Sequence, residues 1–237
     1  MAFIRSLGFS IAFYIWSVVV VLGFMPIYFM SWPQGTWMQR LWSRGVLFIA
    51  RVFVGISYEV KGLEHLPEGS CIIACKHQST FETLALSCIL KDAAYVVKKE
   101  LMQIPFFGWY GWPARHIPVD RKAGAKALRY MFRAASRAKE DGRRIAIFPE
   151  GTRTAVGAKP AYQPGIVALY RHLGLPVVPV AVNSGLFWGR GQFVKKPGRI
   201  TIEFLPIIES GLDKRRFMSR LETEIESATK ALVENPA

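Results

Sequence analysis

The stretch from Ser70 to Glu82 reads SCIIACKHQSTFE, and it decides the fold class. Its first half is a short apolar run, which is typical of a strand buried on both faces of a parallel sheet. Its second half turns polar and leads into a helix-like segment, Ser79–Leu90. His77 follows the apolar run directly, so we expect it at the carboxyl edge of the sheet, where α/β folds carry their sites.

The same alternation of short apolar segments and amphipathic segments continues along the chain. The expected strands are Ser57–Val60, Ser70–Cys75, Ala93–Val97, Arg115–Val119, Ile145–Phe148, Val177–Val182 and 200–204. The expected helices are Ser79–Leu90, Lys122–Asp141, Gly165–His172 and 217–232. This order predicts one α/β domain over residues 56–237, with a mostly parallel sheet flanked by helices. Residues 1–55 are expected to precede it as hydrophobic, membrane-anchoring helices.

The predicted anchor has two parts. No charged residue occurs between Arg5 and Arg40, and residues 9–30 are apolar and long enough to cross a hydrocarbon core of about 30 Å. A cleavable signal peptide fits poorly, because the run is too long and no small-residue cleavage site follows it. The second part, Leu41–Val60, is typical of a helix that lies in the membrane interface. Its cations fall on one helical face: Arg40, Arg44 and Arg51.

Flanking residues predict the orientation of the anchor. Trp32, Trp37 and Trp42 lie where interfacial aromatic residues are expected, and cations are more frequent after the apolar run than before it. The positive-inside rule then places the residues after 40 on the cytoplasmic side of the inner membrane, whether the first segment spans the bilayer or re-enters it. A long core helix is the alternative interpretation of this segment.

Composition limits the class of protein. The 237 residues include 31 Lys and Arg against 17 Asp and Glu, a formal net charge of +14, and 51% are hydrophobic. This hydrophobicity excludes a disordered chain, and three cysteines are too few for a disulfide scaffold. A basic charge on a hydrophobic chain favours an anionic membrane surface over nucleic acid as the partner.

One candidate catalytic pair is His77 and Glu82. A neutral histidine is a general base suited to neutral pH, and a carboxylate can fix its tautomer. Inside one helix, residues five apart point in different directions, so the two meet only if His77 precedes the helix and Glu82 lies in its first turn. Ser79 provides an N-cap for such a start. The alternative is that Ser79 and Glu82 only form a capping box.

Two further strand ends carry arginines. Phe148 begins the stretch FPEGTR, which ends at Arg153, and residues 117–121 read IPVDR and end at Arg121. Arginine binds phosphate through two parallel hydrogen bonds, although a lone arginine at a strand end is usually solvated. Two arginines and a histidine at one sheet edge favour a site for a phosphorylated substrate.

These blocks together resemble the signature motifs of the glycerolipid acyltransferase family. The resemblance rests on His77-x4-Glu82, residues 117–121, FPEGTR at 148–153 and the strand 177–180, and it covers about residues 60–205. Residues 98–101 (KKEL) and 104–108 (IPFFG) are similar to the bacterial lysophosphatidic acid acyltransferases. The chain departs from the family in having Lys76 where Asn is usual and Glu82 where Asp is usual.

The resemblance implies transfer of an acyl chain from acyl-CoA or acyl-carrier protein to the 2-hydroxyl of 1-acyl-sn-glycerol 3-phosphate, giving phosphatidic acid in phospholipid biosynthesis. His77 would act as the general base and Glu82 would orient it, without an acyl-enzyme, a metal or a further cofactor. The substrate-binding residues that the resemblance implies are Arg121, Glu150, Gly151, Thr152, Arg153 and Lys98. The alternatives are acyl transfer to another lysolipid, such as a lyso-ornithine lipid, or a non-catalytic basic protein that binds lipid or nucleic acid.

Three features have a structural and a functional interpretation. The cations Lys122, Lys126, Arg129, Arg133 and Arg137 share one face of a predicted helix, which is either simply solvated or a contact for anionic lipid or an acidic acyl donor. The segment 186–196 mixes aromatic and basic residues and is either an ordinary loop or one that dips into the interface. The cysteines Cys71, Cys75 and Cys88 are expected in the core rather than as metal ligands.

Overall fold

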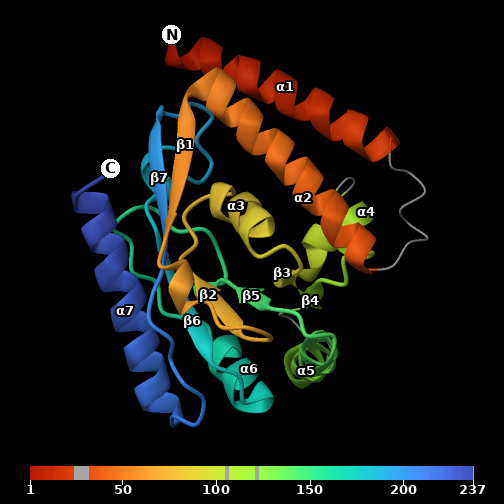
Figure 1. The fold of residues 1–237 in the computed structure, drawn as a ribbon, viewed down its shortest axis with the longest axis vertical. Coiled ribbons are helices and arrows are strands. Elements are labelled where there is room, and N and C mark those ends of the chain that lie inside the picture. Colours follow the sequence, from red (N-terminus) through yellow and green to blue (C-terminus); the bar gives the residue numbers. More distant parts are fainter. Residues whose placement is uncertain (24–31, 105–106, 121–122, 237) are drawn as a thin grey trace.

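The computed structural model describes residues 1–23, 32–104, 107–120 and 123–236. The chain begins with two long helices, α1 (Ala2–Gly23) and α2 (Trp32–Ile49), and a π-helical turn, η2 (Ala50–Val54), continues α2. The remaining helices are α3 (Phe81–Ile89), α4 (Phe107–Gly111), α5 (Gly124–Glu140), α6 (Gly165–Leu173) and α7 (Lys214–Glu234). Short 3₁₀ turns are η3 (Leu63–His65), η4 (Lys99–Gln103) and η5 (Ser184–Leu186). Figure 1 shows α1 and α2 side by side at one end of the molecule.

Seven strands of the described residues form one sheet in the order β1-β7-β6-β2-β5-β3-β4. They are β1 (Ile56–Lys61), β2 (Ile72–Cys75), β3 (Ala94–Lys98), β4 (Ile117–Val119), β5 (Ile145–Ile147), β6 (Val177–Val182) and β7 (Gly198–Phe204). All neighbouring pairs are parallel except β6 and β7, which are antiparallel. Ile72 of β2 lies opposite Ile145 of β5 and Val177 of β6, so these three strands end at one edge. The predicted mostly parallel α/β sheet is confirmed.

The sheet has a hydrophobic core on each face. Ile73 and Cys75 of β2 pack into the core on the side of α2 and α3, where Val46 lies. Ile72 and Ala74 pack into the core on the side of α5, α6 and α7. Because successive side chains of a strand point to opposite faces, burial on both sides requires an uninterrupted apolar run, as the sequence of β2 has.

Helix α1 packs one face on the protein and leaves the other face apolar and exposed. Phe9, Val20 and Val21 are buried, and Gly45 of α2 lies so close to the Trp16 indole that a Cβ there would overlap it. The exposed residues recur at helical spacing: Phe3, Ile4, Leu7, Ile11, Tyr14, Ile15, Val18, Val19 and Leu22. Within the described ranges, α1 is the one helix long and apolar enough to cross a membrane.

A buried cation joins α1 to the segment after β6. The Lys195 ammonium lies over the ring of Phe9 at 4.8 Å from its centroid and over the ring of Trp188 at 5.1 Å. The Lys195 amide donates to Ser6 Oγ at 2.9 Å. Phe193 and Val194, beside Lys195, remain exposed. The basic and aromatic segment 186–196 is therefore attached to α1, with two apolar side chains exposed.

The second helix differs from the prediction for Leu41–Val60. Helix α2 begins at Trp32, and its helical continuation ends at Val54, because Gly55 adopts a left-handed conformation with φ of 83°. Residues from Ile56 onward pair with β7 as a strand instead. Helix α2 also buries Val46 against the core, so the predicted bounds of this helix were wrong, while its location in the membrane interface stays a prediction.

Candidate active site

His77 lies at the carboxyl edge of the sheet, as its position after β2 predicts. The carbonyl of His77 accepts hydrogen bonds from the Thr154 amide at 2.7 Å and from the Thr154 hydroxyl at 3.2 Å. The His77 Nδ1 donates to Glu82 Oε1 at 2.8 Å. With its proton on Nδ1, the neutral ring has its lone pair on Nε2, the atom that a base uses to accept a proton.

Glu82 holds His77 and closes the start of α3 at the same time. Its Oε1 accepts from the amides of Gln78 at 2.8 Å and Ser79 at 2.7 Å, while Ser79 Oγ accepts from the amide of Phe81. The Glu82 side chain is fully buried, and its Oε2 accepts from the Ser184 hydroxyl at 2.7 Å. One carboxylate therefore makes both the histidine contact and half of the predicted capping box, the bond from the Ser79 amide. The other half differs from the prediction, because Ser79 Oγ meets the amide of Phe81 and α3 begins after Thr80.

The imidazole of His77 is also fixed from its flat side. Its ring stacks on Phe148, with centroids 3.9 Å apart and planes inclined by 20°. Phe148 follows β5, which neighbours β2 in the sheet. The side chain of His77 is 16% exposed. Stacking and the Nδ1 contact together allow the ring little freedom.

The turn after Phe148 places Gly151 beside His77, and the Gly151 amide already donates a hydrogen bond within that turn. Gly151 has φ of 70°, and its amide donates to the Phe148 carbonyl at 2.9 Å. This amide is therefore occupied within the turn rather than free to serve as an oxyanion donor. Thr152 is exposed on the outer side of the turn.

Glu150 points into the protein, not toward a substrate. The side chain is buried, Lys76 Nζ lies 3.3 Å from Glu150 Oε1, and the His77 amide donates to that same oxygen at 3.2 Å. Lys76 Nζ also contacts Glu226 Oε1 of α7 at 2.6 Å. Burial raises the pKa of Glu150, an effect that Lys76 opposes. The prediction that Glu150 contacts substrate therefore needs correction, since its carboxylate instead supports the backbone of His77.

The predicted phosphate-binding cations have different surroundings. Arg153 is half-buried, and its Nη1 donates to Thr80 Oγ1 at 2.9 Å, beside the start of α3. Lys98 is exposed at the end of β3 and pairs with Glu100 at 3.4 Å. Arg121 lies outside the described residues. Arg153 and Lys98 thus reach the same edge of the sheet as His77.

A cavity of about 540 Å³ opens beside His77. Its walls are mostly apolar, and Arg153 and Lys98 also line it. The apolar lining residues include Val96, Val97, Val119, Leu128, Met131 and Ile147. This volume is within the range of about 300–1,000 Å³ that is usual for small-molecule sites. An apolar cavity with a histidine and two cations suits an amphiphilic substrate with a negatively charged group.

Three supporting residues were missed by the sequence reasoning. Ser184 was not among the expected site residues, and Lys76 and Phe148 were named only as parts of motifs. A signal for Ser184 existed, because it follows β6 and β6 neighbours β2, so the two strand ends meet at one edge. Nothing in the sequence near Lys76 indicates that it pairs with Glu226 of α7.

Comparisons with known proteins agree with this fold and show the family. Residues 57–183 match the Acyltransferase family, and the chain belongs to that family. A 1-acyl-sn-glycerol-3-phosphate acyltransferase of Pseudomonas aeruginosa is 37% identical over 186 residues, which are 78% of this chain and 72% of that protein. A relative of the same name from Limnanthes alba is 28% identical and covers 81% of this chain and 69% of its own. The fold also matches the crystal structure of the acyltransferase PlsC of Thermotoga maritima, with a TM-score of 0.78, 20% identity and full coverage of both chains.

Proposed function

We propose that this protein transfers an acyl chain from a thioester to the 2-hydroxyl of 1-acyl-sn-glycerol 3-phosphate and so forms phosphatidic acid. The observation that carries the proposal is the His77–Glu82 contact of 2.8 Å at the edge of an apolar cavity that Arg153 and Lys98 also line. The names of the relatives support the choice of acceptor.

The proposed reaction is a direct transfer. His77 Nε2 accepts the proton of the glycerol 2-hydroxyl while the oxygen of that hydroxyl forms a bond to the thioester carbonyl carbon. The tetrahedral intermediate then collapses, the carbon–sulfur bond breaks, and the thiolate takes the proton back from His77. Glu82 stabilises the transient imidazolium because its buried charge already faces Nδ1. No covalent acyl-enzyme is needed.

The acceptor's phosphate is proposed to bind Arg153, with Lys98 as an additional cation. Arg153 has no carboxylate partner among the described residues, and its link to Thr80 holds it near the start of α3. Arg121, from the sequence motif, remains a predicted third cation. Thr152 and Gly151 are proposed to shape the rim of this site rather than to supply charge.

The membrane location fits a lipid acceptor. We infer that α1 embeds its exposed apolar face in the cytoplasmic leaflet of the inner membrane, with the catalytic domain on the cytoplasmic side. One face of α1 packs on the protein, which favours a helix lying in one leaflet over one surrounded by lipid on all sides. A lysolipid then reaches the cavity without exposing its chain to water, which costs about 0.8 kcal/mol per CH₂.

Product analysis tests the function. Purified protein is offered lysophosphatidic acid, lyso-ornithine lipid and other lysolipids, each with acyl-CoA or acyl-carrier protein, and mass spectrometry identifies the products. Phosphatidic acid formed by the native protein and lost in His77→Ala is the expected result. Acyl transfer only to an acceptor without phosphate, or unchanged product in His77→Ala, would contradict the proposal.

A further inference from the structure

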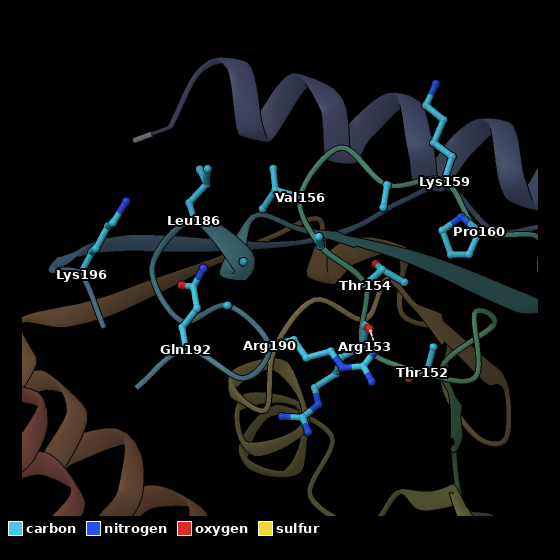
Figure 2. Close-up of a pocket in the computed structure, with 14 residues that line it drawn as sticks. Thr152, Arg153, Thr154, Val156, Lys159, Pro160, Leu186, Arg190, Gln192 and Lys196 are labelled. Carbon is cyan, nitrogen blue, oxygen red and sulfur yellow. Dashed lines mark hydrogen bonds between the residues drawn. The ribbon is translucent and has the colours of Figure 1, made fainter. Parts of the chain in front are cut away.

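A second cavity, of about 860 Å³, adjoins the first and is lined by a different set of cations. One wall is the chain after the FPEGTR turn, and the other is the segment after β6 that is attached to α1. Arg153 lines both cavities. Figure 2 shows Arg153 and Arg190 together, with Lys159 and Lys196 on either side of them.

The four cations of this cavity are Arg153, Lys159, Arg190 and Lys196. None of them forms an ion pair with a carboxylate anywhere in the described part of the chain. Arg190 Nη1 donates only to the backbone carbonyl of Arg153, at 2.9 Å, which keeps the two arginines adjacent. A concave site with one sign of charge concentrates the electrostatic field, so it attracts a ligand with several negative charges.

The lysophosphatidic acid phosphate accounts for only part of this charge. In the proposed function it binds Arg153 and Lys98 beside the first cavity, which leaves Lys159, Arg190 and Lys196 without a ligand. The same reaction needs a second substrate, a thioester. Coenzyme A joins its thiol to a nucleotide with a diphosphate and a 3′-phosphate, so it brings the additional negative charges.

We propose that the second cavity binds the phosphate-bearing nucleotide part of an acyl-CoA donor. This inference rests on the proposed acyl transfer. The phosphates contact Lys159, Arg190 and Lys196. Arg153 lies where the two cavities meet, and the thioester arm extends past it toward His77. The site is separate from the acceptor site except at Arg153.

The shape of the site favours a small molecule over a carrier protein. Its volume lies within the usual range for small ligands, whereas a folded carrier protein docks on an open surface. The exposed cations of α5, Lys126, Arg129, Arg133 and Arg137, form such a surface and have no carboxylate partner in the described residues. A carrier-protein donor would therefore depend on α5 and not on this cavity.

The test begins with binding, which does not depend on turnover. Isothermal titration measures coenzyme A and 3′-dephospho-coenzyme A on the purified full chain in detergent. The variant Lys159→Ala/Arg190→Ala/Lys196→Ala is expected to bind coenzyme A about 10- to 100-fold more weakly, because exposed charge contacts contribute a factor of about 2 to 5 each. Arg171→Ala is the matched control, since Arg171 is exposed on α6 and has no ion pair in the structure as described. Added salt should weaken the native complex more than the variant complex.

Kinetics then separate the two substrates. The triple variant should raise the KM for acyl-CoA while leaving the KM for lysophosphatidic acid nearly unchanged. With an acyl-N-acetylcysteamine thioester, which carries no phosphate, the difference between the native protein and the variant should disappear. Arg133→Ala should not change the KM for acyl-CoA.

Three outcomes would overturn the inference. The first is coenzyme A binding that is unaffected in the triple variant, and the second is an equal loss in Arg171→Ala. The third is a raised KM for lysophosphatidic acid alone, which would assign the cavity to the acceptor. Coenzyme A binding that depends on these cations, in a protein that forms no phosphatidic acid, would instead refute the proposed function and keep the nucleotide site.

Discussion

Replacing Glu82 with glutamine tests whether its charge or its capping bonds matter. A glutamine at position 82 retains a carbonyl oxygen for the His77 Nδ1 and for the amides of Gln78 and Ser79, which Glu82 Oε1 now serves. Its amide group then faces the Ser184 oxygen, which can accept the hydrogen bond that it now donates. The substitution therefore preserves the helix cap and removes only the negative charge.

The expected loss of turnover in Glu82→Gln follows from the removed negative charge. Unit charges about 4 Å apart near a protein surface interact by about 4 kcal/mol, and each 1.36 kcal/mol changes a rate about tenfold. His77 is charged in the transition state but not before it, so the loss falls on turnover. We expect Glu82→Gln to lower kcat by about 10²–10³-fold, somewhat less than the loss in His77→Ala, with little change in the KM for either substrate.

The assay is thiol release from acyl-CoA in the presence of lysophosphatidic acid, with thermal unfolding in the same detergent. Ser184→Ala is the matched control, because it removes one hydrogen bond from a neutral hydroxyl to the same carboxylate and keeps the charge. This hydrogen bond is present both before and during the reaction, so kcat should fall much less than in Glu82→Gln. Near-native turnover in Glu82→Gln, with a lower unfolding temperature, would show that Glu82 only caps α3.

Three other predictions concern different parts of the molecule. Arg153→Ala should chiefly raise the KM for lysophosphatidic acid, with partial rescue by lysine, because a phosphate held equally before and during reaction gives uniform binding; unchanged acceptor kinetics would place the phosphate elsewhere. The pKa of Glu150 is higher in the folded protein than in the unfolded chain, so protonation of Glu150 stabilises the folded state. This stabilisation is complete below the ordinary pKa of 4.5 and is lost as the pH rises through the raised pKa. Glu150→Gln should therefore gain unfolding temperature relative to the native protein between acid and neutral pH, and a constant difference across that range would contradict the shift. Gly45→Ala should destabilise the packing of α1 by about 1–3 kcal/mol because its Cβ meets the Trp16 indole, seen as faster proteolysis of α1, whereas Gly23→Ala, with open space around it, is the control.

The sequence predicted best what depends on neighbouring residues. His77 and Glu82 lie five residues apart across the end of β2 and the start of α3, so their contact follows from where the helix begins. The order and type of the strands likewise follow from apolar runs such as that of β2. These features need no knowledge of how distant segments meet.

Contacts between distant segments were beyond such reasoning. Ser184 reaches Glu82 across 102 residues, and Lys76 reaches Glu226 across 150. The inward-facing Glu150 pairs with Lys76, which directly follows the neighbouring strand β2, and this contact cannot be read from the motif FPEGTR alone. The end of the second helix was also misplaced, because pairing of Ile56 with β7 overrides the apolar pattern.

The Lys195 contact has a consequence for how the protein leaves a bilayer. The Lys195 ammonium is buried against Phe9 of α1 and Trp188, and this burial lowers the pKa of Lys195. Separating α1 from the protein would expose the ammonium to water and would release the segment that carries Arg190 and Lys196. By thermodynamic reciprocity, whatever steadies that segment also strengthens the attachment of α1. A chain without α1 would thus lose the contacts that steady the segment carrying Arg190 and Lys196. With α1 embedded in lipid as proposed, bilayer properties that pull on this helix, such as thickness or curvature, would tune how firmly the second cavity holds a charged ligand.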